Sequence, residues 1–197
     1  MRDTLNAKRR LALAGITTIC VLAAAVPAAA QTGGTGTPGT TTTTTTTDPA
    51  APVGPPGRAH LLRDGTAVAP SDAPANIQAA IAAGNAIHTY PYHWGGGHRS
   101  FTDTGYDCSG AVSYVLHAAG LLTSPMTSGG FASSWGAPGK GRWITVYGNA
   151  SHVYMIVAGL RFDTSSGGDR WNQGSGPRWR KKKRKPVGYT GKYFPGY

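Results

Sequence analysis

Apolar residues recur at helical spacing in two stretches of the chain. In residues 76–87 they stand three and four positions apart, at Ile77, Ala80, Ile81, Gly84 and Ile87. The second stretch begins near Cys108 and carries the stripe Ala111, Val112, Val115, Leu116 and Ala119. Both patterns predict a short helix with one buried face, and Gly120 stands where the second helix should be capped.

Three later segments, 143–147, 153–157 and 160–164, are rich in β-branched and aromatic residues and predict strands. The end of the chain, 189–197, predicts an edge strand because a proline and two glycines suit an edge better than a sheet centre. The Ser-, Gly- and Pro-rich segment 123–141 predicts a loop. Since helices come first and strands second, the expected fold class is α+β, not an alternating parallel-sheet fold.

The segment 1–30 has the pattern of an export signal. Basic residues come first, the apolar run 11–26 follows, and three alanines at 28–30 offer small residues for cleavage. We therefore expect an extracytoplasmic protein, secreted or associated with the cell wall. The alternative is an uncleaved membrane anchor, since 11–30 is just long enough to span a bilayer, although polar residues and a proline interrupt it. A membrane is expected as a partner only if the signal stays uncleaved.

The amino-acid composition divides the rest of the chain into a linker and one domain. Residues 31–57 are rich in Thr, Gly and Pro and poor in large apolar groups, so they predict a disordered linker. The remainder, 58–197, is long enough for one domain of catalytic size. The 29 glycines and 14 prolines of the whole chain argue against a helical bundle.

Much of the formal net charge of +11 comes from a single segment, 178–185, in which every position except Trp179 is basic. One interpretation of this segment is a solvated loop. The other is a loop that attracts anionic wall polymers, an interaction that salt would screen. Nucleic acid is not an expected partner, because binding it would need a basic face with stacking groups on a folded platform, and an exported chain rarely meets it.

Only one of the chain's 2 cysteines stands outside the export signal. With Cys20 in the apolar run of that signal, a disulfide framework and a four-cysteine zinc site are both excluded. Cys108 stands at the start of a predicted helix, where unpaired N–H groups and the helix dipole favour a thiolate. It is therefore a candidate nucleophile, and the alternative is a small buried apolar residue.

A thiol nucleophile needs a base, and histidine is the obvious one. His117 lies on the same predicted helix as Cys108 but about 13 Å further along its axis, too far to reach the thiol. His152 opens a predicted strand, and Asp163 on the next strand is available to orient its ring. The residues thus allow a Cys–His–Asp arrangement.

Three histidines at five-residue intervals, His88, His93 and His98, invite a zinc interpretation. Their spacing fits neither the i, i+4 face of a helix nor a ligand pair close to a cysteine. No metal is expected. His93 and His98 flank the turn that contains Trp94, and so are candidates to line a substrate cleft.

Three short motifs follow one another along the chain: Tyr-Pro-Tyr-His-Trp-Gly-Gly at 90–96, Tyr-Asp-Cys-Ser-Gly at 106–110 and His-Val-Tyr-Met-Ile-Val at 152–157. Together they resemble the NlpC/P60 family of papain-like cysteine peptidases, over about residues 76–165. The resemblance implies N-terminal helices packed on a small antiparallel sheet. It also implies a hydrolase without a cofactor that cleaves peptidoglycan stem peptides, typically between D-glutamate and a diamino acid.

The same resemblance implies roles for individual residues. Cys108 falls on the family nucleophile, His152 on its base and Tyr92 on the tyrosine that borders the nucleophile and helps the oxyanion region. The third polar position is commonly a histidine, and here it falls on Asp163 if a one-residue gap is allowed. The neighbours of these motifs, Trp94, Ser109 and His93, are the expected substrate-binding residues.

Two other classes of function fit the same motifs. One is a peptidoglycan-binding module that has kept the cleft but lost activity. The other is an acyltransferase of the same fold, which would pass the acyl group to an amine or lipid instead of to water.

Overall fold

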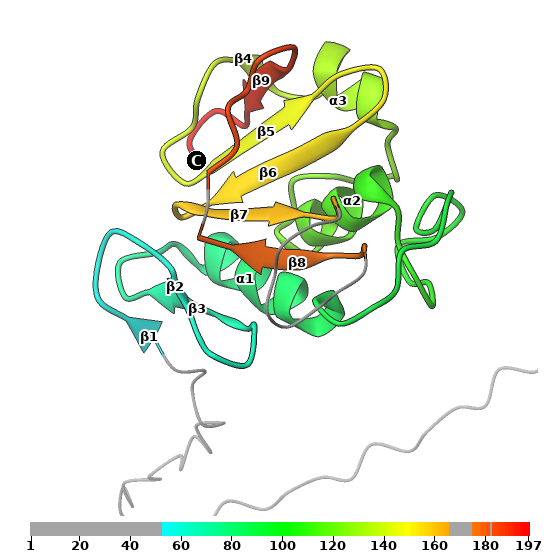
Figure 1. Cartoon of the computed structure of the whole chain (residues 1–197). Helices are drawn as coiled ribbons and strands as arrows, with labels where there is room; N and C mark the ends of the chain where they lie inside the picture. The colour runs from blue at the N-terminus through cyan, green and yellow to red at the C-terminus, as the bar shows by residue number, and fades with distance from the viewer. Residues whose placement is uncertain (1–52, 166–174, 182) are drawn as a thin grey trace, which may run out of the picture. The chain divides into compact units, whose positions relative to one another are not determined.

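The computed structural model describes residues 53–165, 175–181 and 183–197, which belong to one compact unit, Thr47–Tyr197 (Figure 1). The predicted export signal and residues 31–52 of the predicted linker lie outside the described residues. Among the described helices, none is long and apolar enough to cross a membrane.

The main sheet has six strands in the order β4-β9-β5-β6-β7-β8, and all its pairings are antiparallel. The strands are β4 (Ala137–Pro138), β5 (Ile144–Gly148), β6 (Val153–Val157), β7 (Leu160–Asp163), β8 (Arg178–Arg180) and β9 (Thr190–Tyr193). The three strands predicted from their β-branched and aromatic residues are confirmed as β5, β6 and β7. With its helices at the start and its sheet mostly at the end, the chain is compatible with the α+β class.

The C-terminal strand is not at the edge of this sheet, which corrects the prediction for 189–197. Strand β9 lies between β5 and the two-residue strand β4. Ala137 and Pro138 pair with Tyr193 and Lys192, so they cover the side of β9 that would otherwise be open. Pro195, which suggested an edge, comes after the strand has ended.

A second sheet was not predicted from the sequence. It consists of β1 (Val53–Gly54), β2 (His60–Leu61) and β3 (Ala67–Pro70), with β3 in the middle. Strand β1 is parallel to β3, and the backbone N–H of Gly57 donates to the Asp72 carboxylate at 2.6 Å. The predicted disordered linker therefore reaches too far, because its last five residues, 53–57, are ordered by pairing and hydrogen bonding.

Three helices accompany the sheets: α1 (Ala75–Ile87), α2 (Cys108–Ala118) and α3 (Ser128–Ser133). The first two confirm the predicted helices. They pack on each other, α2 also packs on β6 and β7, and α1 packs on β8, so both lie behind these strands in Figure 1. At the end of α2, Gly120 has a φ of 70° and its N–H donates to the carbonyl of His117, as a C-terminal glycine cap requires.

The third helix corrects the loop prediction for 123–141. Helix α3 spans only six residues, too few for a periodic apolar stripe, and its N-cap is Thr127, whose side chain accepts from the N–H of Gly130. Phe131 is fully buried and anchors it. This short element is stabilised by its cap and by tertiary packing, neither of which hydrophobic spacing could reveal.

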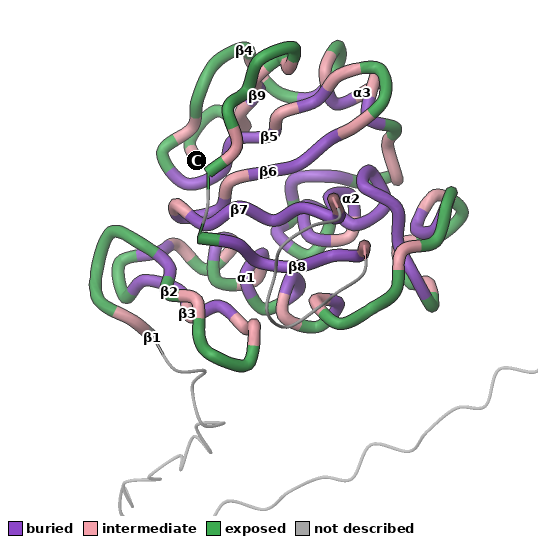
Figure 2. The backbone as a smooth tube through the Cα atoms, in the orientation of Figure 1, coloured by how far each residue is buried: buried purple, intermediate pink, exposed green. Residues whose placement is uncertain are grey.

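Strand β8 corrects the interpretation of 178–185 as one basic loop. Its three residues pair with β7, and both strands are buried along their length (Figure 2). The indole of Trp179 donates to Asn85 of α1 at 3.0 Å. A Cβ on Gly84 would come within 2.3 Å of the Trp179 ring, so this glycine, which lowers helix propensity, allows α1 to approach β8.

Candidate active site

The thiol of Cys108 belongs to the first residue of α2. The helix is capped by Asp107, whose carboxylate accepts from the backbone N–H of Gly110 at 2.8 Å. Cys108 is 8% exposed and is a free cysteine. Its sulfur therefore stands at the positive end of a helix dipole, where the N–H groups of the first turn have no acceptor within the helix.

The N-terminal cap of α2 is itself held by several contacts. The ring of His98 contacts the Asp107 carboxylate at 2.9 Å, and the backbone N–H of Gly95 donates to it at 3.1 Å. The hydroxyl of Ser109 donates to the same carboxylate at 3.1 Å. The segment around residue 95 is thus fixed against the start of the helix that carries the thiol.

Close backbone contact reinforces this attachment. A Cβ on Gly110 would lie 1.9 Å from the carbonyl oxygen of Gly96. A Cβ on Gly96 would lie 2.2 Å from the carbonyl oxygen of Gly105. Because only glycine permits such approaches, the glycines of two motifs, 90–96 and 106–110, have a packing role that brings the motifs together.

His152 and Asp163 form a hydrogen-bonded pair. His152 immediately precedes β6 and Asp163 ends β7, and the Nε2 atom of the ring lies 2.9 Å from Oδ1 of the carboxylate. The loop before His152 is held by Asn149, whose side-chain oxygen accepts from the backbone N–H of His152 at 2.9 Å. The start of β6 and the end of the adjacent antiparallel strand β7 therefore bring the imidazole and the carboxylate into hydrogen-bonding contact.

The pKa values of both residues favour the charged form of this pair. Burial by itself would lower the pKa of His152, but the hydrogen bonds and charges of Asp163 and Cys108 outweigh burial and raise this pKa to about 9. Burial also opposes ionisation of Asp163, yet hydrogen bonds from His152 and Ser165 hold its pKa well below the usual range. At neutral pH the pair is an imidazolium beside a carboxylate.

The thiol of Cys108 is close enough to His152 to act on this pKa through both a hydrogen bond and its charge. Since Nε2 engages Asp163, the ring nitrogen left for the sulfur is Nδ1. Carboxylate and imidazole are thus hydrogen-bonded, and with the nearby thiol they form a chain of titratable groups. Such a chain can move a proton from a thiol and return it to a leaving group.

Besides His152, three other residues contact the carboxylate of Asp163. The backbone N–H and the hydroxyl of Ser165 donate to it at 3.0 and 2.8 Å. Arg161 and Arg184 each lie 3.4 Å from its Oδ2 atom. These contacts fix the plane of the carboxylate and, through it, the orientation of the imidazole.

A pocket of about 250 Å³ opens beside His152. Its lining consists of Tyr92, His152, Thr164, Ser165, Ser175 and Arg184. Burial, followed by the nearby charges of Cys108 and Asp107, raises the pKa of Tyr92, so its hydroxyl stays protonated and able to donate. Tyr92 and His152 therefore line the same pocket, and Tyr92 is near enough to Cys108 to feel its charge.

The three expected substrate-binding residues do not line this pocket. Ser109 is 4% exposed and its hydroxyl is engaged with Asp107 and His98. Trp94 is 88% exposed, and His93 is exposed as well. Their substrate-binding role therefore stays a prediction, based on the closeness of these residues to the motifs in the sequence. In the part of the chain that the structure describes, no three His, Cys, Asp or Glu side chains gather as metal ligands would.

Two residues of the site were missed from the sequence. Ser165 lies two positions beyond Asp163 in a segment without a pattern of its own. Arg184 was one base among many in 178–185, and nothing local distinguishes it from its neighbours. Only the chain path beyond β8 brings its guanidinium to the carboxylate.

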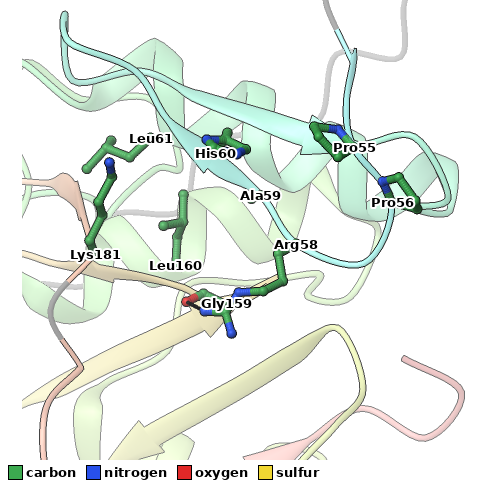
Figure 3. A pocket seen from close by; sticks show the side chains of 9 residues that line it. All are labelled: Pro55, Pro56, Arg58, Ala59, His60, Leu61, Gly159, Leu160 and Lys181. Atoms are coloured by element: carbon green, nitrogen blue, oxygen red, sulfur yellow. Dashed lines mark hydrogen bonds between the residues drawn. The ribbon is translucent and has the colours of Figure 1, made fainter.

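A second pocket, of about 430 Å³, lies away from this chemistry (Figure 3). It is formed by residues of the segment 55–61, by Gly159 and Leu160, and by Lys181. It is larger than the pocket beside His152, but its lining includes none of Cys108, His152 and Asp163, whereas His152 lines the smaller pocket. The smaller pocket beside His152 is the candidate active site.

Comparison with known proteins gives little further information. No family model matches the chain, and no curated protein matches it. The chain is similar to a solved structure of Rv1477, a hypothetical invasion protein of Mycobacterium tuberculosis, with 20% sequence identity and a TM-score of 0.40. The match covers 60% of this chain and 63% of that one. A likeness at this level carries no argument about activity, so the function must be inferred from the site itself.

Proposed function

We propose that the chain is an exported cysteine peptidase of the NlpC/P60 type that hydrolyses peptide bonds in peptidoglycan stems. The observation that carries the proposal is the hydrogen bond between Asp163 and His152, together with the thiol of Cys108 at the start of α2, which is near enough to raise the pKa of His152. Two of the three motifs that resemble the family supply Cys108 and His152, Asp163 follows the third motif, and the substrate class comes from that resemblance. The D-glutamyl–diamino acid bond is the proposed point of cleavage.

In the first step, Cys108 attacks the scissile carbonyl carbon as a thiolate, and His152 holds the thiol proton. Thiolate formation by itself contributes little, because an ordinary thiol is already about 3% ionised at pH 7 and full ionisation gains only about thirtyfold. Most of the rate enhancement must therefore come from the groups that act on the carbonyl oxygen and on the leaving amine.

The carbonyl oxygen becomes negatively charged as the sulfur attacks. The backbone N–H of Cys108 has no acceptor within its helix, and Tyr92 is a protonated donor on the pocket wall. A donor placed on such an oxyanion contributes about 2.7–4 kcal/mol. These two groups are the proposed oxyanion donors.

The C–N bond breaks as the imidazolium of His152 gives its proton to the departing amine, which leaves a thioester on Cys108. Water, deprotonated by the now neutral ring, then attacks the thioester and releases the acid. General acid–base catalysis of this kind contributes about 10²–10⁴ in rate. Asp163 keeps the proton on Nε2, so that Nδ1 carries out both transfers.

The test is mass spectrometry of defined muropeptides after incubation with the wild type and with Cys108→Ala. Hydrolysis by the wild type alone, with a mass gain of one water, is the expected result. Binding without cleavage would instead support the inactive wall-binding module. A product that carries an added amine acceptor in place of water would support the acyltransferase.

Anionic wall polymers are the proposed second partner. Arg178 and Arg180 are not available to such a polymer, because both are buried in strand β8 of the sheet. Lys181, Lys183 and Lys185 remain exposed and have no carboxylate partner among the described residues. These three lysines are the cations that would attract a wall polymer.

A further inference from the structure

Arg184 is placed in the candidate active site by three contacts. Its Nη1 atom lies 3.4 Å from Oδ2 of Asp163, and its side chain is 34% exposed. The guanidinium carbon lies 5.5 Å from the ring centre of Tyr154 and 5.2 Å from that of Tyr189. The two tyrosine rings pack edge to face with centres 5.2 Å apart, so they form a rigid support for the cation.

The ion pair with Asp163 does not use the full binding capacity of this side chain. A guanidinium has five N–H donors, and among the described residues Asp163 is the acceptor that Arg184 meets. At 3.4 Å the contact is longer than a strong charge-assisted hydrogen bond, and Oδ2 also accepts from Ser165. Most of the guanidinium edge therefore has no protein acceptor in the described part of the chain.

Arg184 also lines the pocket beside His152. The other lining side chains are an imidazole and four hydroxyl-bearing residues, and no carboxylate is among them. One of these hydroxyls, Oγ1 of Thr164, belongs to a residue that is 2% exposed and has no hydrogen-bond partner in the described structure. A pocket with cations, hydroxyl donors and an unsatisfied polar atom is complementary to an anion.

We propose that Arg184 is a specificity-determining residue that binds a carboxylate of the substrate next to the scissile bond. The planar fork of a guanidinium suits a carboxylate, and its fixed support among Tyr154, Tyr189 and Asp163 reduces the entropy lost on binding. The inference rests on the proposed peptidase function and adds a substrate class to it: acidic peptides in preference to their amides.

The alternative role for Arg184 is electrostatic support of Asp163, without contact to the substrate. The two roles predict different effects on the kinetic constants. Support of Asp163 would affect kcat for every substrate equally, whereas a carboxylate contact would act chiefly on KM and only for substrates that have the carboxylate.

The experiment compares two synthetic stem peptides that differ only in the α-carboxyl group of the glutamyl residue, which is free in one and amidated in the other. The wild type should cleave the free acid with a kcat/KM about 10- to 100-fold higher. Arg184→Gln should abolish this preference through KM, and Arg184→Lys should restore part of it. Arg63→Gln, which removes the charge of an exposed arginine that does not line the pocket, is the matched control and should keep the preference.

Equal cleavage of both peptides by the wild type would overturn this inference and leave the peptidase function intact. So would an equal loss of both activities in Arg184→Gln, since that result assigns the residue to support of Asp163. Cleavage of neither peptide by the wild type would overturn the peptidase function and the specificity together. Equal cleavage by the wild type would overturn the inference even if Arg184→Gln does not fold, and Arg184→Lys, which keeps the charge but not the planar fork, then tests whether Arg184 itself sets the preference.

Discussion

The Nε2 atom of His152 lies 2.9 Å from Oδ1 of Asp163, although the two residues belong to different strands. This contact decides which ring nitrogen carries the proton and which one is left for the sulfur of Cys108. It also joins the imidazole to a carboxylate that Ser165, Arg161 and Arg184 already fix. The reactivity of the site should therefore depend on a residue that never touches the substrate.

Replacement of Asp163 is the direct test of that dependence. Asp163→Ala removes the acceptor and the charge, and we expect kcat/KM to fall by about 10²–10⁴. Asp163→Asn keeps an acceptor but loses the charge, so its loss should be smaller, and the pKa of His152 should fall below about 9. Titration of the His152 ring by NMR measures this pKa, with the exposed Asp64→Asn as control. An unchanged titration in Asp163→Asn would contradict the role of the carboxylate.

The activity of the wild type should have an alkaline limit set by His152. The imidazolium is the acid that protonates the leaving amine, and its pKa is raised to about 9. Below that pH the proton is present, and above it the proton is lost, so kcat/KM should decline as pH rises through about 9. A pH–rate profile on a muropeptide substrate measures the limit, and a decline centred near 6.5, the value of an ordinary histidine, would show that the pair does not form in solution.

Gly84→Ala should destabilise the fold, although alanine is the better helix former by about 1 kcal/mol. The new Cβ would lie 2.3 Å from the ring of Trp179, which is held in β8 by sheet pairing and by its hydrogen bond to Asn85. Overpacking of this kind costs about 1–3 kcal/mol. Urea unfolding measures the change, and the double variant Gly84→Ala/Trp179→Leu should recover part of the loss. A more stable single variant would show that α1 and β8 are not this close.

Retention on purified cell walls should depend on the exposed lysines of the basic segment. The triple variant Lys181→Gln/Lys183→Gln/Lys185→Gln should elute at lower salt than the wild type, because fewer charges attract the anionic polymer. A control that loses the same charge elsewhere, Arg63→Gln/Arg99→Gln/Lys140→Gln, should elute close to the wild type. Wild-type retention that persists unchanged up to 1 M salt would exclude an electrostatic attraction.

Short-range patterns in the sequence were enough to predict the elements of the site. Apolar spacing located α1 and α2, and β-branched and aromatic runs located β5, β6 and β7. Because Cys108 starts one of these elements, and His152 and Asp163 flank two others, the three residues could be proposed as a group. Each of these inferences depends on residues within a few positions of one another, where helix and strand periodicity act.

The segment 178–185 shows what local patterns could not decide. Its bases look equivalent in the sequence, yet pairing of β8 with β7 buries Arg178 and Arg180, Lys181 and Lys183 are exposed, and Arg184 reaches Asp163. The same holds for Ser109, whose hydroxyl is engaged by the cap of α2 and not by a substrate pocket. Where a charged or polar side chain ends up depends on strand register and on contacts between distant segments, and only the tertiary structure determines these.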